Sequence, residues 1–307
     1  TPDELDDFWT AGGGQRTEFY GLSGFPYEAG YLGFLWLFHI TDGNNDGPIH
    51  CELVSSRDGM SWTRQAAQAG RRMPMLALGA PGRWDDGMVF TPNHPLVEGD
   101  TIKLWYGGFG STHNQAGVTE SASIGLATLR KDGFASLDAG SAIGTVTTKR
   151  FQALRGDLHV NVCATNGWLR VEVLDRNGAV LPGYSRADCV PVRTNSVDAL
   201  VTWAAHRVLP VAEGPLRLRF VLQNASLYSF KAGETADLGL EPGLNLLYDF
   251  EDDSAVDITD KFTSDGAQNG IVHNNARFGI QQTCGLCVPP AWMTLTNTSS
   301  RSATLPR

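Results

Sequence analysis

The 307-residue sequence has few cysteines, no run of lysine or arginine and no apolar run of membrane-spanning length. Five cysteines are too few and too scattered for a disulfide scaffold, so we expect most to be buried thiols. The formal charge is −9, and the basic stripe of a nucleic-acid-binding protein is missing. The most apolar segment, Tyr31–Ile40, is about half as long as a membrane span needs to be. Neither nucleic acid nor a membrane is therefore expected as a partner.

Motifs of several common enzyme classes are also missing. There is no G-x-S-x-G nucleophile elbow, and the Gly12–Gly14 run is followed by Gln15, where a phosphate-binding loop would continue to Lys and Ser. Cys284 and Cys287 form a C-x-x-C pair without a second pair, so no metal site is predicted. The N-terminus carries no charged-then-apolar signal pattern.

What the sequence has in quantity is turn residues. The 35 glycines and 15 prolines divide it at short intervals, which suits many short strands better than long helices. We therefore predict an all-β chain, and the length predicts about two domains.

Two segments about 70 residues apart share one layout of strands, charged turns and aromatics. The first has a hairpin turn at Tyr27–Gly30 and a strand at Ile49–Ser56, and the second begins at Met88. Such units predict consecutive blades of four short strands in a β-propeller. The repeated turns that contain Asp58 and Asp132 are expected to be structural.

From Gly144 to Phe230 the pattern changes to evenly spaced alternating strands, which predicts an antiparallel β-sandwich. Its inward positions are predicted to be Leu158, Val160, Leu169, Val171, Val173, Trp203, Leu218 and Phe220. After Lys231 comes a Gly- and acid-rich linker, and the last residues lose all periodicity.

These motifs carry a family resemblance. The segments RWDDGMVFTP, LWYGGF and GLATLRKDGFASLDAG resemble the closing blades of bacterial proteins in the five-bladed propeller superfamily of invertases, arabinanases and related glycoside hydrolases. The sandwich resembles the domain that commonly follows such a propeller, and the stretch from LLYDFEDD to NNARFG is similar to the opening of a concanavalin-like jelly-roll module. The resemblance implies a secreted or periplasmic protein that acts on oligo- or polysaccharides.

The predicted organisation is therefore a partial β-propeller of about two blades over residues 1–140, a β-sandwich over 141–232, and a linker with an incomplete jelly-roll-like tail over 233–307. Two blades cannot close a ring, so their apolar faces need a partner. We expect a homo-oligomer whose interface includes Phe34, Trp36 or Phe38; the alternative is that the sandwich covers them within one chain.

Glycoside hydrolysis needs two carboxyl groups on either side of the scissile bond. The candidates are Asp85 or Asp86 in the RWDDGM segment, with Trp84 as a stacking face for a sugar ring, and Glu18 from the neighbouring blade. Adjacent strand residues point to opposite faces, so one aspartate at most faces the funnel. The alternatives are turn aspartates that cap a strand and a solvated glutamate.

His113, Asn93 and His94 are candidates for contacts with sugar hydroxyls, and His113 could also hold an ion on the axis; the alternative for His113 is a loop histidine without function. No cofactor is predicted; Ca²⁺ at Asp249–Asp253 is weighed against a solvated acidic surface. The sequence thus predicts a glycoside hydrolase-like protein, or alternatively a non-catalytic carbohydrate-binding or assembly fragment of a larger propeller enzyme.

Overall fold

The computed structural model describes residues 2–6, 14–28, 30–41, 44–64, 72–117, 122–151, 156–210 and 215–232, and the backbone of three later strands, 258–260, 268–273 and 276–279. The chain is all-β, and the described residues form no helix. Accordingly, no described segment is a helix that could cross a membrane. The Asp249–Asp253 run and the Cys284–Cys287 pair lie outside the described residues.

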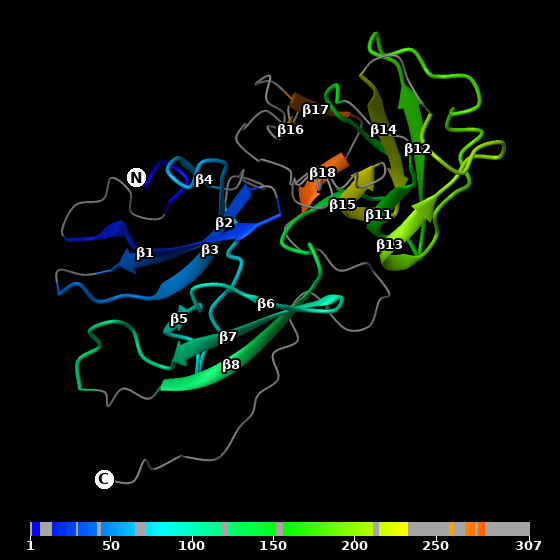
Figure 1. The fold of residues 1–307 in the computed structure, drawn as a ribbon. Coiled ribbons are helices and arrows are strands. Elements are labelled where there is room, and N and C mark those ends of the chain that lie inside the picture. Colours follow the sequence, from blue (N-terminus) through cyan, green and yellow to red (C-terminus); the bar gives the residue numbers. More distant parts are fainter. Residues whose placement is uncertain are drawn as a thin grey trace.

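The first eight strands form one sheet that curves into a half-barrel (Figure 1). They are β1 (Arg16–Tyr27), β2 (Gly30–Ile40), β3 (Ile49–Ser56), β4 (Trp62–Arg64), β5 (Met88–Phe90), β6 (Leu96–Glu98), β7 (Thr101–Phe109) and β8 (Ala122–Arg130). Strands β1 to β4 form one antiparallel meander, and β7 pairs with β5, β6 and β8 in a second. A single parallel pair, Ile49 with Met88, joins the two.

The predicted hairpin at Tyr27–Gly30 is confirmed. The turn uses Glu28 in the left-handed region, with φ of 51°, and β1 pairs with β2 from Arg16 opposite Ile40 down to Tyr27 opposite Gly30. The turn at Asp58 is also structural, since its Oδ1 accepts hydrogen bonds from the N–H groups of Met60 and Ser61. The first meander therefore has the turn chemistry that its sequence predicts.

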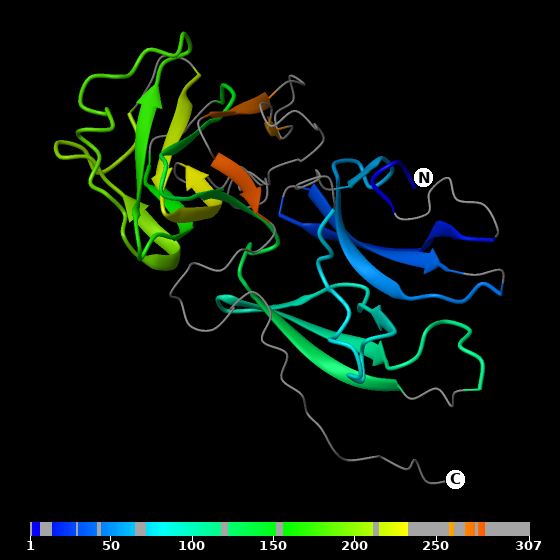
Figure 2. The same cartoon turned by 180° about the vertical axis from the view of Figure 1, so that it is seen from behind.

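The remaining strands form two five-stranded sheets (Figure 2). They are β9 (Ser136–Ala139), β10 (Gly144–Thr147), β11 (Leu158–Cys163), β12 (Trp168–Leu174), β13 (Asn195–Val201), β14 (Arg217–Gln223), β15 (Ala225–Ala232), β16 (Ile258–Asp260), β17 (Gln268–His273) and β18 (Ala276–Gly279). One sheet has the order β12-β14-β10-β17-β16 and the other β13-β11-β15-β9-β18.

The two five-stranded sheets share one hydrophobic core. It takes side chains from alternate positions of both sheets, because successive strand residues point to opposite faces. All eight predicted inward residues are buried in it: Leu158, Val160, Leu169, Val171, Val173, Trp203, Leu218 and Phe220. The predicted register of these strands is therefore confirmed.

The half-barrel has its own cores, and they correct part of the sequence prediction. Phe34 is fully buried and Phe38 is 3% exposed within the single chain. Phe34 packs with residues of both meanders, and Phe38 packs with Met88 of the second. An intersubunit contact through Phe34 or Phe38 is therefore ruled out, because the second meander already covers them. Trp36, the third residue of that prediction, is partly buried, and the homo-oligomer stays a prediction.

The cysteines also differ in part from the expectation. Cys51 and Cys189 are buried free thiols, and burial raises the pKa of Cys189 to about 11. Cys163 is disulfide-bonded. The chain therefore combines inert buried thiols with at least one oxidised cysteine.

Candidate functional site

A β-bulge exposes an aromatic ring on β1. The pairing of β1 with β2 is interrupted between Phe19 and Gly21, so Tyr20 has no partner across the ladder and is 48% exposed. Gly21 lies opposite Trp36, and a Cβ at Gly21 would come within 2.7 Å of the indole ring. Glycine is therefore needed beside the bulge, since it leaves room for Trp36 while Tyr20 turns outward.

The Tyr20 ring gathers aromatic residues from three other segments. Its centroid lies 5.7 Å from that of Phe38, 5.9 Å from that of Phe90 and 5.3 Å from that of His113. The Tyr20 hydroxyl and His113 Nε2 are 3.0 Å apart and share a hydrogen bond. Strands β1, β2 and β5 and the loop after β7 thus meet at one point.

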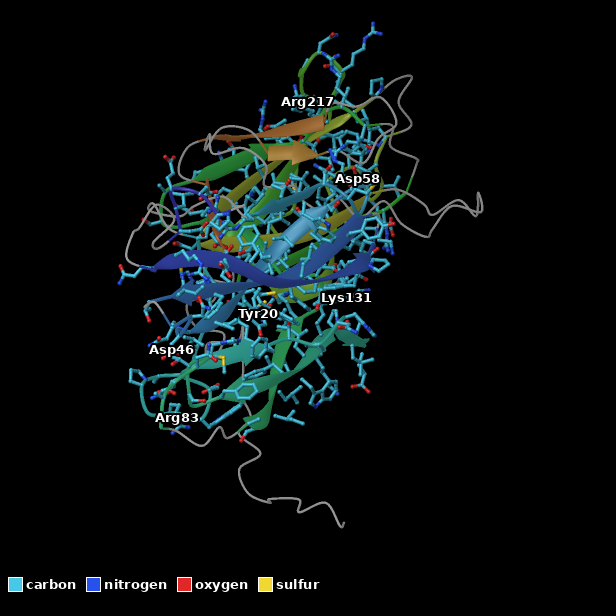
Figure 3. The ribbon with its side chains drawn as sticks, turned by 90° about the vertical axis from the view of Figure 1, so that its left-hand side faces the viewer. Tyr20, Asp46, Asp58, Arg83, Lys131 and Arg217 are labelled. Atoms are coloured by element: carbon cyan, nitrogen blue, oxygen red, sulfur yellow. The ribbon has the colours of Figure 1, made fainter. Side chains whose placement is uncertain are left out.

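Two loops are tied together beside this aromatic group. The His113 N–H donates to the Gly47 carbonyl at 3.1 Å, and the Asn114 N–H donates to Asp46 Oδ1 at 3.1 Å. The Asn114 side-chain amide donates to the carbonyls of Asn44 and Asn45. Figure 3 labels Tyr20 and Asp46 on this part of the half-barrel. We call the surface made by Glu18, Tyr20, Asp46, His113 and Asn114 the rim.

Glu18 belongs to the rim through Phe38. Glu18 lies opposite Phe38 in the ladder, and the Phe38 ring is 4.8 Å from that of His113. The Glu18 side chain is 49% exposed and accepts a 2.5 Å hydrogen bond from Arg16 Nε. His113 Nδ1 is buried without a hydrogen-bond partner among the described residues. Two sequence-predicted residues, Glu18 and His113, are therefore neighbours of the same phenylalanine.

Asp85 has a different environment. Its side chain is 3% exposed, and its Oδ2 accepts a 2.8 Å hydrogen bond from the Tyr106 hydroxyl of β7. Burial, together with the bond to Asp85 and its charge, raises the pKa of Tyr106, which therefore stays protonated and donates. A Cβ at Gly79 would come within 2.0 Å of Asp85 Oδ1, so backbone covers the second oxygen. Asp85 thus anchors the loop before β5 to β7.

Asp86 and Trp84 hold the same loop. Asp86 Oδ2 accepts a 2.5 Å hydrogen bond from the Gly82 N–H, which is the turn-capping alternative that the sequence left open. Trp84 stacks on Tyr106 with ring centroids 5.6 Å apart and is partly buried. In strand order, β2, β3 and β5 separate β1, which carries Glu18, from β7, which holds Asp85.

The other predicted contact residues are exposed. Asn93 and His94 lie on the surface of the loop between β5 and β6. The hydrogen bond from Trp36 Nε1 to Thr91 Oγ1, 2.9 Å long, places the start of this loop beside Trp36. Within the described ranges, no three His, Cys, Asp or Glu side chains gather as they would around a metal ion.

Sequence reasoning missed Tyr20, Asp46 and Asn114. Tyr20 stands in a segment that predicts an ordinary strand, and alternation alone does not reveal a bulge. Asp46 and Asn114 are about 70 positions apart and meet through the pairing of β3 with β5 and of β5 with β7. The glycine after Tyr20 was the one available signal, since glycine inside a strand often marks a bulge.

Comparison with known proteins assigns no function to this site. No protein-family model matches the chain, and no curated protein matches it.

Proposed function

We propose that this chain binds saccharides at the rim and does not hydrolyse them. The observation that carries the proposal is the environment of the predicted carboxylates. Asp85 is buried against Tyr106, Asp86 caps a turn, and Glu18 is exposed on β1 beside Arg16. Hydrolysis requires two carboxyl groups that face one scissile bond, and both oxygens of Asp85 are covered, one by the Tyr106 hydroxyl and the other by the backbone at Gly79.

Binding needs less than hydrolysis does. Saccharide recognition requires an accessible aromatic face and a few polar groups fixed in place. Tyr20 offers a half-exposed ring, and its hydroxyl is held by His113. Asp46 and Asn114 are fixed by hydrogen bonds between their loops. The rim therefore combines an aromatic face with carboxylate, amide and imidazole groups. The aromatic face can pack on the apolar face of a sugar ring, and the polar groups can form hydrogen bonds with its hydroxyls.

We also propose an assignment of the sheets to known architectures. We infer that β1–β4 and β5–β8 are two propeller blades and that the two five-stranded sheets form a β-sandwich, with β16–β18 as the beginning of a jelly-roll-like module. The antiparallel meanders and the core shared by the two sheets support this. A disulfide at Cys163 supports a secreted or periplasmic location, where disulfides form and persist.

The test is affinity electrophoresis of the purified chain in gels that contain neutral plant or microbial polysaccharides. Tyr20→Ala and His113→Ala should each weaken binding by about fivefold, which corresponds to about 1 kcal/mol for one contact. Met60→Ala is the control, because Met60 is 86% exposed in the turn between β3 and β4, outside the rim. Equal retardation of all four proteins would contradict the proposal.

Hydrolysis is tested in parallel with aryl glycosides and oligosaccharides. We expect no product from the unchanged chain. Product release that is lost in Glu18→Ala and in Asp85→Ala or Asp86→Ala would instead establish the paired-carboxylate hydrolase.

A further inference from the structure

The outer face of the β12-β14 pair is rich in arginine, although the chain as a whole is acidic. Leu169, Val171 and Val173 point inward, so Trp168, Arg170 and Glu172 point outward. On β14, Arg217 and Arg219 also face outward, and Arg219 lies opposite Glu172. Burial lowers the pKa of Arg217, and the charges of Arg150 and Arg219 lower it further (Arg217 is labelled in Figure 3). Positive charge is therefore crowded on this face.

An open pocket of about 640 Å³ lies on this face. Its lining includes three arginines, one tryptophan, one glutamate and one serine: Arg170, Arg186, Arg193, Trp168, Glu172 and Ser185. The residues come from β12 and from the segment between β12 and β13, which turns back over the sheet. The pocket therefore belongs to a different sheet from the rim.

The arginines are held in position by the surrounding structure. Arg170 Nη1 donates to the Arg186 carbonyl at 2.8 Å, and Arg193 Nη1 donates to the Gly167 carbonyl at 3.0 Å. The Arg186 guanidinium lies 4.9 Å from the centre of the Trp168 ring, and that of Arg170 lies 5.9 Å from it. Because a guanidinium carries five N–H donors, each of these bonds leaves several donors for a ligand.

The one carboxylate of the pocket is already paired. Glu172 Oε2 accepts a 2.9 Å hydrogen bond from Arg219 Nη1, and its Oε1 accepts one from the Arg186 N–H at 3.2 Å. Arg219 neutralises the charge of Glu172 from outside the lining, so three guanidinium charges remain for a ligand. The pocket is thus electrostatically suited to an anion.

We propose that this pocket binds a saccharide that carries carboxylate or sulfate groups. Guanidinium groups match planar carboxylates and sulfate oxygens with paired hydrogen bonds. An open pocket lined by three arginines has room for an anionic sugar unit of a longer chain, whose other units can lie outside it. The choice of a saccharide as the carrier of the anion rests on the proposed function; the choice of an anion rests on the arginines alone.

The test is calorimetric titration of the full chain with dextran sulfate, with polygalacturonate and with neutral dextran. Replacing Arg186 and Arg193 together by alanine should weaken binding of at least one anionic polymer by about tenfold or more, since each loses a charge-assisted hydrogen bond. The matched control is Arg207→Ala, because Arg207 is 73% exposed outside the pocket and its nearest carboxylate is 4.0 Å away. The control should bind the same polymer within about twofold of the unchanged chain.

Each result decides the proposal. Loss for dextran sulfate alone assigns a sulfated sugar, and loss for polygalacturonate alone assigns a uronic acid. Equal binding of the anionic polymers by the double variant and the unchanged chain, equal losses in Arg207→Ala, or an equal loss of neutral dextran binding in the double variant would overturn the site. So would duplex DNA that binds more tightly than both polymers and is lost in the same double variant, because the partner would then be a nucleic acid.

Folding is checked by the thermal transition, and Arg193→Ala alone replaces the double variant if that variant unfolds. A negative result for anion binding in the pocket can be distinguished from a negative result for saccharide binding at the rim. Tyr20→Ala should bind the anionic polymers normally, whereas Arg186 and Arg193 have no part in the binding of neutral polysaccharides at the rim.

Discussion

The Tyr27 hydroxyl donates a 2.7 Å hydrogen bond to Asp132 Oδ1 across 105 positions of sequence. The same hydroxyl accepts a bond from the Asp132 N–H at 3.2 Å, and Asp132 Oδ2 accepts one from Ser229 Oγ at 2.9 Å. Tyr27 ends β1 in the half-barrel, and Ser229 lies in β15 of a five-stranded sheet. Asp132 therefore links the half-barrel to the C-terminal sheets through one carboxylate.

Tyr27→Phe should weaken this link. The substitution removes both bonds of the hydroxyl and leaves the Asp132 carboxylate short of a donor at a part-buried position, which costs about 1–3 kcal/mol. Burial and the charge of Asp132 raise the pKa of Tyr27, so the hydroxyl is present as donor throughout the usual pH range. Urea unfolding measures the loss.

Tyr31→Phe is the control for that loss. Tyr31 stands in the adjacent strand, and its hydroxyl makes no hydrogen bond that the described residues reveal. We expect a change below about 0.5 kcal/mol for a surface substitution of this kind. Equal effects of the two substitutions would mean that the bond to Asp132 adds nothing to stability.

The link at Asp132 was predicted from the sequence only in part. The turn itself was predicted, because Lys131, Asp132 and Gly133 form a turn signal, and the structure has Asp132 in the left-handed region with φ of 54°. What the carboxylate does was not predictable, since its two partners come from β1 and β15. Local signals fix turns and strand faces; contacts between distant strands depend on how the sheets pack.

The same limit applies to the candidate site. Their positions at strand ends predict a role for Glu18 and His113, and both flank Phe38 in the structure. The tryptophan beside Asp85 and Asp86 predicts a sugar site there, yet the two aspartates hold their own loop through Tyr106 and Gly82. Adjacent acidic residues in a Gly-rich loop look alike in sequence whether they face a ligand or cap a turn.

Val171→Asp should prevent folding of the C-terminal sheets. Val171 is fully buried, and an aspartate there would place an unpaired charge in the shared core, at a cost of several kcal/mol. The matched control is Val190→Asp, because Val190 is 50% exposed. Solubility and the cooperativity of thermal unfolding separate the two, and a soluble, cooperatively folded Val171→Asp protein would mean that the strand register is wrong.

Asp138 should make stability depend on pH. Burial raises its pKa to about 6, against hydrogen bonds from Ser226 and Ser136 that lower it. The folded chain therefore holds this proton more tightly than the unfolded chain, whose pKa is near 3.8. The contribution of Asp138 to stability is greatest below pH 3.8 and falls as the pH rises to about 6.

Asp138→Asn should consequently stabilise the chain at pH 7.5 by about 1–3 kcal/mol and give little gain near pH 4. Asp58→Asn is the opposite case, because the N–H groups of Ser61 and Met60 lower the pKa of Asp58 to about 2. That substitution should reduce the melting temperature at pH 7.5. A lower melting temperature for Asp138→Asn at pH 7.5 would contradict the predicted sign.

Self-association, predicted from the blade count, needs a different surface from the one first expected. Phe34 and Phe38 are buried, but the outer face of the second meander exposes Leu96 by 50%, Trp105 by 46% and Ile124 by 71%. The pairing of Leu96 with Lys103 and of Trp105 with Leu126 puts these three residues on one face of the sheet. Exposed apolar side chains that share one face are a candidate interaction surface.

We expect a second copy of the chain to cover this patch with closed symmetry. Trp105→Glu together with Ile124→Glu should then convert the oligomer to a monomer without a loss of thermal stability beyond about 1 kcal/mol, because neither side chain is buried in the single chain. Val180→Glu is the control, since Val180 is 39% exposed in the C-terminal sheets. Sedimentation at micromolar concentration measures the state, and a monomer for the unchanged chain would mean that no second copy occupies this face.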